Sequence, residues 1–187
     1  MAGTVLVTGA AGRIGTWLRG SLPERGWAVR GLDVVDVPDR RPGEDHRVAD
    51  ATDLDAVVAA AEGAAAVVHL AGIATESTWP AIRQSQIESS YVALEAARRT
   101  GVQRVVLASS NHATGYTPRP AGGLLAEADA PPRPDTFYGV AKVTMEALGS
   151  LYSDRYGLDV VCLRIGSALP EPTSLRHLST WLSPTDR

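Results

Sequence analysis

The sequence predicts an α/β fold, in which a doubly wound parallel sheet of strand order 3-2-1-4-5-6 carries helices on both faces. Two observations predict it. Short apolar runs alternate along the chain with longer helical patterns, and most of these runs are continuously apolar, as in strands that are buried on both faces. In addition, a glycine-rich turn, Gly9–Gly15, joins the first run to the first helical pattern. The ligand crevice of such a sheet lies at the carboxyl ends of its strands.

The elements follow from these patterns in chain order. The predicted strands are Thr4–Thr8, Ala28–Asp33, Arg47–Ala49, Ala66–Leu70, Arg104–Ala108 and Val160–Arg164. The predicted helices are Ile14–Leu22, Leu54–Glu62, Trp79–Arg99 and Tyr138–Tyr156. Asp53 has the side chain to cap the start of the second helix, and Gly101 and Gly157 suit the ends of the third and fourth.

Three stretches do not fit the alternation. The segment between Asp33 and Arg47 contains too much proline and glycine for a helix, so we expect a short crossover there. The segment Asn111–Asp135 contains five prolines and is expected to be a long surface connection, which is often functional at that length. After Arg164 we expect an irregular chain without a further helix or strand.

Composition narrows the class of protein. The 187 residues favour a single domain, residues 1–187. The formal net charge of -3 argues against a nucleic-acid-binding protein. The sequence contains no run of about 18 apolar residues, which argues against a membrane span. The start of the sequence lacks the basic segment of a signal peptide. Because Cys162 is the only cysteine, we expect no intramolecular disulfide and no cysteine-based zinc site. No other metal site is predicted, and together these features make a cytoplasmic location the default expectation.

The glycine turn is a candidate phosphate-binding site. Gly9, Gly12 and Gly15 follow a predicted strand and precede a predicted helix, in the spacing GxxGxxG. Glycines let backbone N–H groups approach a pyrophosphate, and the helix N-terminus carries favourable partial charge. The alternative is a tight strand-to-helix turn without a ligand. Asp33, which ends the second strand about 20 residues further on, favours the dinucleotide interpretation.

Asp33 also bears on the choice of cofactor. Its carboxylate can accept hydrogen bonds from the adenine ribose and would repel a 2′-phosphate, which favours NAD over NADP. Arg13 in the glycine turn could pair with a phosphate, which weakly favours NADP. The alternative for Arg13 is a solvated surface residue.

The fourth predicted helix carries a candidate acid–base pair. Tyr138 and Lys142 are four residues apart and therefore share one helix face. A cation one turn away, together with a positive nicotinamide ring nearby, favours the phenolate form of tyrosine. Tyr138 could then take a hydroxyl proton while hydride leaves the same carbon. Ser109 and Ser110 end the preceding strand at the same edge of the sheet, where a hydroxyl can orient the reacting oxygen. Alone, the tyrosine–lysine spacing is common on exposed helices.

Four segments occur in a recognisable order: TGAAGRIG (8–15), HLAG (69–72), SSNH (109–112) and YGVAK (138–142). Together they resemble the extended branch of the short-chain dehydrogenase/reductase superfamily, also called the NAD-dependent epimerase/dehydratase superfamily, which implies a Rossmann fold. SSNHATGY (109–116) and LRIGSALPEPTSLRHLSTW (163–181) resemble the uronate dehydrogenase family. That family oxidises the C1 hydroxyl of galacturonate or glucuronate with NAD to an aldarolactone. The resemblance implies NAD as cofactor, a sugar acid as substrate, and a homo-oligomer.

The resemblance also implies roles for the matching residues. Ser110, Tyr138 and Lys142 would be catalytic. The cofactor would contact Gly9, Gly12, Arg13, Ile14, Gly15, Asp33, Asp50, Ala51, Leu70, Ala71, Gly72, Ser109, Tyr138, Lys142 and Ile165. The sugar acid would contact Ser110, Asn111, His112, Ser167 and Arg176.

Several of these residues have simpler alternatives. Asp50 could cap the loop before the next helix, His112 could bond only to its own loop, and Ser167 could cap a turn. Arg176 could be a surface arginine. His69 is expected in or near the sheet rather than on a ligand.

The chain departs from the family pattern at three positions near the expected substrate. Ala74 replaces a serine, and Gln86 and Ser89 replace an asparagine and a glycine. Relatives carry a further strand and C-terminal helices, so residues 165–187 are interpreted as the start of a substrate-binding segment that is truncated here.

Three functions are compatible with these features. The first is NAD-dependent oxidation of a hexuronic acid, with Tyr138 as the base. The second is a nucleotide-sugar epimerase or dehydratase, which shares the glycine turn and the tyrosine–lysine pair but gives no reason for Arg176. The third is a dinucleotide-binding sensor without turnover.

Overall fold

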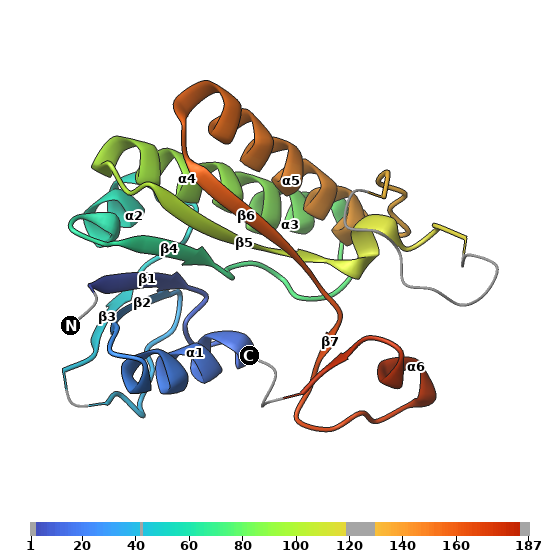
Figure 1. Ribbon diagram of the computed structural model, residues 1–187, viewed down its shortest axis with the longest axis horizontal. Helices are drawn as coiled ribbons and strands as arrows, with labels where there is room; N and C mark the ends of the chain where they lie inside the picture. The colour runs from blue at the N-terminus through green and yellow to red at the C-terminus, as the bar shows by residue number, and fades with distance from the viewer. Residues whose placement is uncertain (1–2, 42, 119–129, 184–187) are drawn as a thin grey trace.

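The parallel sheet has the predicted order. The computed structural model describes residues 3–41, 43–118 and 130–183, with the side chain of Arg176 excepted. Six strands lie in the order β3-β2-β1-β4-β5-β6, and every pair between neighbours is parallel (Figure 1). The strands are β1 (Thr4–Thr8), β2 (Ala28–Asp33), β3 (Asp45–Val48), β4 (Ala66–His69), β5 (Arg104–Ser110) and β6 (Asp159–Ile165). The predicted fold class is therefore confirmed.

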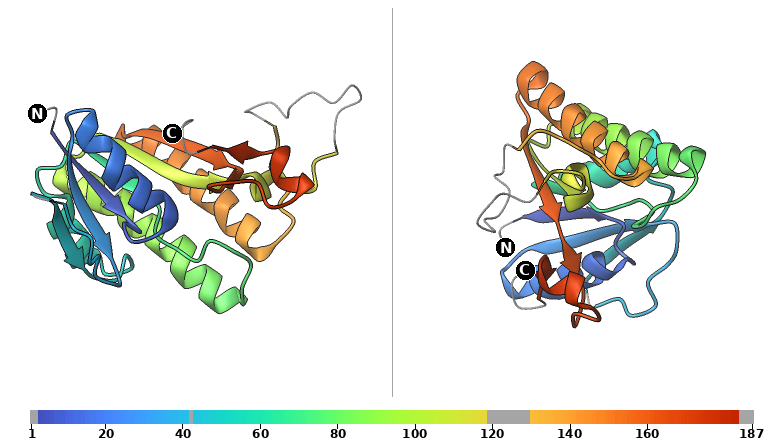
Figure 2. Two further views of the ribbon diagram at one scale, coloured as in Figure 1. Left: turned by 90° about the horizontal axis from the view of Figure 1, so that it is seen from below. Right: turned by 90° about the vertical axis from the view of Figure 1, so that its right-hand side faces the viewer.

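Helices cover both faces of this sheet. Helix α1 (Arg13–Glu24) lies on one face, and α2 (Leu54–Ala61), α4 (Ser89–Thr100) and α5 (Phe137–Tyr156) lie on the other (Figures 1 and 2). The expected caps are present: the Asp53 side chain accepts from the N–H of Ala56, and Gly101 and Gly157 adopt left-handed conformations at the ends of α4 and α5. Sequence patterning thus located the helix ends to within one or two residues.

The hydrophobic core has two parts, one on each face of the sheet. The larger part packs β-strand residues such as Leu6, Val67 and Leu107 against helices α2, α4 and α5. The smaller part packs Val5, Val7 and Val29 against partly buried side chains of α1. The carboxyl ends of the parallel strands all lie at one edge of the sheet, where the ligand crevice of such a fold is expected.

The helix predicted at Trp79–Arg99 consists of three consecutive segments. They are α3 (Trp79–Ile82), a π-helical segment η1 (Arg83–Glu88) and α4. The hydroxyls of Ser89 and Ser90 donate to the carbonyls of Ser85 and Gln86. Such side-chain bonds compete with the regular helical ladder and account for the local widening.

The C-terminal segment is not irregular, so that prediction is wrong. Strands β7 (Ser167–Ala168) and β8 (Trp181–Leu182) form a second, two-stranded parallel sheet, with the short helix α6 (Leu175–Leu178) between them. The N–H of Ser167 donates to the carbonyl of Thr180 at 2.8 Å. Elements this short contain too few residues to show a periodic pattern in sequence. They form because of contacts with residues that are distant in the chain. In Figure 1 the segment lies beyond the end of β6.

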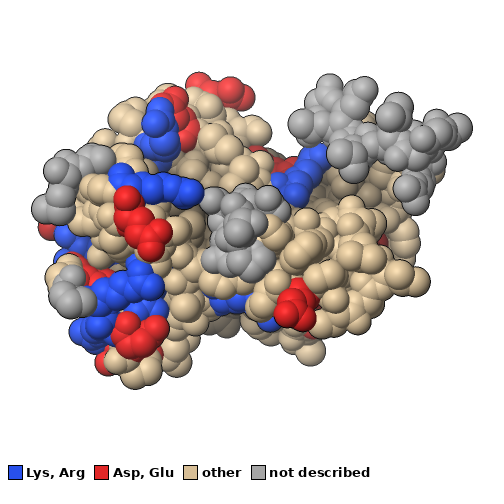
Figure 3. All heavy atoms as spheres, turned by 60° about the horizontal axis from the view of Figure 1, so that its bottom comes forward, with Lys and Arg blue, Asp and Glu red and all other residues tan. Residues whose placement is uncertain are grey.

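Within the described residues, none of the helices combines the length and apolar character needed to cross a membrane. On the face seen in Figure 3, arginine and acidic side chains stand beside one another rather than forming separate areas.

Candidate active site

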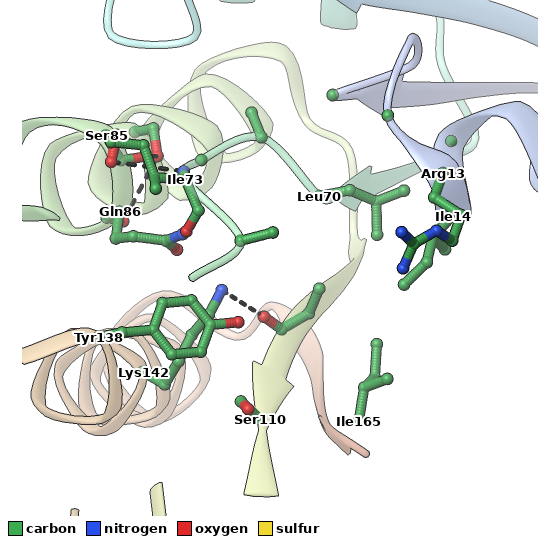
Figure 4. Close-up of a pocket in the computed structure, with 18 of the residues that line it drawn as sticks. Arg13, Ile14, Leu70, Ile73, Ser85, Gln86, Ser110, Tyr138, Lys142 and Ile165 are labelled. Carbon is green, nitrogen blue, oxygen red and sulfur yellow. Dashed lines mark hydrogen bonds between the residues drawn. The ribbon is translucent and has the colours of Figure 1, made fainter. Parts of the chain in front are cut away.

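A cavity of about 800 Å³ opens at the carboxyl edge of the sheet. Its walls come from the carboxyl ends of the six strands of the main sheet and the residues that follow them, from the starts of α1 and α5, from η1 and from the C-terminal segment. Every residue that the sequence analysis assigned to the cofactor, to catalysis or to the substrate lines it, apart from Arg176. Arg176 belongs to α6, and its side chain lies outside the described residues. Figure 4 shows Tyr138 and Lys142 across the cavity from Arg13 and Ile14.

The glycine turn has the shape that a pyrophosphate requires. Gly9 has a φ of 69°, and a Cβ there would lie 2.8 Å from the backbone nitrogen of Ala71. A Cβ on Gly15 would lie 2.3 Å from the carbonyl oxygen of Gly9. Gly12 caps α1 without a side-chain hydrogen bond, and the first turn of α1 holds no acidic residue. The N–H groups of that turn therefore meet the cavity without a side-chain acceptor, which suits an anion.

Asp33 is anchored to the same turn. Its Oδ2 accepts a hydrogen bond from the N–H of Ala11 at 2.9 Å, and its Oδ1 accepts one from Val35 at 3.3 Å. Each carboxylate oxygen keeps a further lone pair for a hydroxyl group. Asp50 also lines the cavity, but its Oδ1 accepts from the N–H and the hydroxyl of Thr52, which is the local turn that sequence reasoning gave as an alternative.

Arg13 joins the glycine turn to the C-terminal segment. Its guanidinium Nη1 donates to the carbonyl oxygen of Ala168 at 3.2 Å. Arg13 is exposed and lines the cavity, and this hydrogen bond connects it to the C-terminal segment.

Tyr138 and Lys142 lie together on the cavity face of α5. Lys142 is only 4% exposed, and its Nζ donates to the carbonyl oxygen of Ala108 at 2.6 Å. The same Nζ lies 5.2 Å from the centre of the Tyr138 ring. The predicted proximity on one helix face is thus present in the structure.

Burial affects the pKa values of both members of this pair. Burial raises the pKa of Tyr138, and a hydrogen bond with the Ser110 side chain opposes the rise. Burial lowers the pKa of Lys142 to about 7. Both groups lose solvation that would favour their charged forms.

The two serines at the end of β5 play different parts. Ser109 donates its hydroxyl to Glu146 Oε1 at 2.5 Å, and Glu146 forms a two-point ion pair with Arg164 on β6. Ser110 donates to Asn111 Oδ1 and accepts from the N–H of His112, both at 3.2 Å. Of the two hydroxyls, only that of Ser110 interacts with Tyr138, as expected of a residue that orients a reacting oxygen.

His112 lies beside Tyr138 and pairs with an acid that the sequence analysis did not assign. The His112 ring stands edge-on to the Tyr138 ring, with centroids 5.8 Å apart, and its Nδ1 lies 2.8 Å from Asp135 Oδ1. Burial alone would raise the pKa of the Asp135 carboxyl, but the hydrogen bond and charge of His112 leave it below the ordinary value. Ser167, by contrast, bonds through its hydroxyl to Thr180.

Two further residues make contacts that the sequence analysis did not predict. Glu76, after β4, accepts hydrogen bonds from the N–H groups of Phe137 and Tyr138 at 3.1 and 2.9 Å, so it ties the Leu70–Trp79 loop to the start of α5. Gln86 is 1% exposed and donates to the carbonyl of Ile73 at 2.6 Å, whereas its Oε1 has no partner among the described residues. Sequence gave no signal for Glu76, because its partners are backbone groups 61 residues away.

His69 is a structural histidine, as expected. It is fully buried at the end of β4, with Nδ1 2.8 Å from Thr8 Oγ1 and Nε2 3.3 Å from Ser89 Oγ. Ser89 donates its own proton to the carbonyl of Ser85, so His69 must donate to Ser89 from Nε2. Burial, with a smaller contribution from the charge of Lys142, lowers the pKa of His69 to about 3.

Comparisons with known proteins show the family of the chain. The model of the "NAD dependent epimerase/dehydratase family" matches residues 5–180. This chain belongs to that family. Similar proteins within the family include the uronate dehydrogenase of Pseudomonas syringae pv. tomato, with 40% identity over 180 residues that cover 96% of this chain and 64% of the relative. The uronate dehydrogenase of Agrobacterium fabrum is 40% identical over 97% of this chain and 68% of its own length.

A solved structure in this family agrees with the fold. A mutant of the Agrobacterium tumefaciens uronate dehydrogenase, complexed with NAD, has a TM-score of 0.89 and 39% identity, covering 97% of this chain and 67% of that one. The chain therefore spans about two thirds of the length of the relatives that it matches.

Proposed function

We propose that the protein is an NAD-dependent oxidoreductase that oxidises the C1 hydroxyl of a hexuronic acid, galacturonate or glucuronate, to an aldarolactone. The observation that carries the proposal is one cavity that contains the glycine turn with Asp33 at one end and the Ser110, Tyr138 and Lys142 cluster at the other. Membership of an NAD-dependent family and about 40% identity to uronate dehydrogenases support the same reaction.

Each end of the cavity has a separate task in this proposal. Backbone N–H groups of the glycine turn hold the pyrophosphate, and Asp33 accepts hydrogen bonds from the adenine ribose. NAD, when bound, accepts the hydride. Tyr138 takes the proton of the reacting hydroxyl, and Ser110, which forms a hydrogen bond with Tyr138, orients that oxygen. Lys142, with its ammonium group 5.2 Å from the Tyr138 ring, favours the phenolate through its positive charge.

The sugar acid is proposed to lie between this cluster and the C-terminal segment. Asn111, His112 and Ser167 line that side of the cavity. We assign the substrate carboxylate to Arg176 on the strength of the sequence resemblance, because a guanidinium matches a carboxylate bidentately. Residues 1–187 then constitute one dinucleotide-binding domain, with 165–187 contributing to the substrate side.

The experiment is a direct assay. Purified protein is mixed with NAD and galacturonate, glucuronate or neutral galactose, and NADH absorbance is followed. The proposal predicts NADH with the acids and little with galactose, and it predicts that Arg176→Ala weakens the preference for the acid by roughly 1.5–3 kcal/mol. NADH formation with galactose equal to that with the acids would refute the assignment of a uronic acid.

An epimerase or dehydratase of the same family would recycle its NAD and release no NADH, so the same assay separates the two. We further propose a cytoplasmic location, where NAD is available, and a homo-oligomer by analogy with the superfamily. Light scattering on the purified protein tests the oligomer.

A further inference from the structure

The pairing of His112 with Asp135 determines which ring nitrogen carries a proton. Asp135 Oδ1 lies 2.8 Å from His112 Nδ1, and a carboxylate can only accept a hydrogen bond. In neutral His112 the proton is therefore on Nδ1, and Nε2 is left with a free lone pair. His112 lines the cavity beside Tyr138.

The surrounding backbone is built to bring Asp135 to this position. Arg133 donates its N–H to the carbonyl of Ala113, and Tyr116 donates to the carbonyl of Arg133, both at 2.9 Å. These bonds join the two ends of the long connection between β5 and α5. A Cβ on Gly115 would lie 2.1 Å from Asp135 Oδ2, so glycine permits the approach of the carboxylate.

Asp135 is itself well held. Its side chain is 19% exposed, against 32% for His112, and the Thr136 hydroxyl donates to the same Oδ1 at 3.2 Å. Thr136 caps α5 through the N–H of Gly139. Through Asp135 and Thr136, the His112 ring is therefore linked to the start of α5, the helix that carries Tyr138.

We propose that Asp135 is a positioning residue that holds His112 as the Nδ1–H tautomer, so that Nε2 accepts a hydrogen bond from a hydroxyl group of the sugar. This inference rests on the proposed function for the identity of the ligand, whereas the tautomer does not depend on it. Asp135 acts on binding of the sugar and not on binding of the dinucleotide.

The tautomer is tested by ¹⁵N correlation spectra of the histidine rings at about pH 8, where a free imidazole is neutral. His112 is expected as Nδ1–H, and His69, whose contacts require Nε2–H, is the internal reference of opposite type. In Asp135→Asn, where the amide can also donate, the Nδ1–H preference of His112 is expected to weaken. A wild-type His112 protonated on Nε2 would overturn the inference even if the protein oxidises uronates.

The effect on the ligand is tested by calorimetry with galacturonate added to the protein–NADH complex. Asp135→Asn is expected to raise the Kd of galacturonate about tenfold and to leave the Kd of NADH unchanged. In a His112→Ala background the same substitution is expected to have almost no effect, because Asp135 acts through the histidine. An equal loss in both backgrounds would show a merely structural role and overturn the proposal.

A matched control accounts for loss of an acidic side chain at a helix start. Asp53 is an acidic residue directly before α2, which it caps, and it does not line the cavity. Asp53→Asn is expected to lower stability without changing the Kd of galacturonate; a tenfold change there would also count against the inference. If wild type binds no hexuronate, the proposed function fails, and the spectra alone decide the tautomer.

Discussion

The ammonium group of Lys142 lies 5.2 Å from the centre of the Tyr138 ring, and both groups are removed from water by the surrounding cavity walls. Burial raises the pKa of the phenol and lowers that of the ammonium group to about 7. Burial thus opposes the charged form of each group, while the short distance between them lets the positive charge of one favour the negative charge of the other.

Substitution of Tyr138 by phenylalanine tests its assigned role as base. The ring still packs, but the proton acceptor is removed, so kcat is expected to fall by about 10²–10⁴ while the Kd of NAD stays nearly unchanged. Tyr152→Phe is a matched control on the same helix, because its buried hydroxyl bonds to Glu95 instead of facing the cavity. That control is expected to lose stability and keep its turnover. Near-normal turnover in Tyr138→Phe would mean that another group is the base.

Lys142→Met removes the cation while keeping a buried side chain of similar length. The phenolate of Tyr138 loses its positive neighbour, so the limb of the kcat–pH profile that reports the base is expected to move to higher pH. A displacement of one unit lowers the ionised fraction at neutral pH about tenfold. The measurement is kcat between about pH 6 and 10. An unshifted profile would show that Lys142 does not influence the ionisation of Tyr138.

Asp33→Asn tests the choice of dinucleotide. The carboxylate is held against the glycine turn by the N–H of Ala11, so a 2′-phosphate on the ribose would meet its negative charge. Wild type is expected to bind NAD more tightly than NADP, and the variant to narrow the ratio of the two Kd values by about tenfold. Calorimetric titration with both cofactors measures this ratio. Equal affinities of the wild type for NAD and NADP would indicate that Arg13 pairs with the 2′-phosphate and offsets the repulsion by Asp33.

His69 makes the folded protein sensitive to acid. Its pKa falls from the ordinary 6.5 to about 3 in the folded state, so the unfolded chain binds the proton more readily between these values. Stability is therefore complete above about pH 6.5 and decreases as pH falls towards 3, by about 2 kcal/mol at pH 5 from this group. Urea denaturation of wild type and His69→Gln across this range gives the measurement. The variant is expected to show a flatter dependence on pH, and parallel curves would show that other groups determine acid stability.

The sequence identified those parts of the site that follow from local spacing. The glycine turn and the pair Tyr138 and Lys142 were predictable, because chain geometry alone places them at a strand–helix junction or on one helix face. Ends of parallel strands gather at one edge, which also brought Asp33 and Ser110 into the prediction.

The remaining parts depend on contacts between distant segments. Glu76 binds backbone N–H groups of α5, and Asp135 becomes a partner of His112 only when the long connection closes. The strands β7 and β8 have two residues each, too few for any pattern. The effect of burial on the pKa of Tyr138 could not be predicted either, because charges can be read from sequence whereas the loss of solvation cannot.

The most direct test of the account follows the hydrogen on C1 of the sugar. Galacturonate deuterated at C1 is incubated with the protein and NAD, and the reduced dinucleotide is analysed by mass spectrometry. Direct hydride transfer from C1 predicts that the dinucleotide gains the deuterium and that turnover is slower than with the unlabelled sugar. Reduced dinucleotide without deuterium, or none at all, would contradict the account.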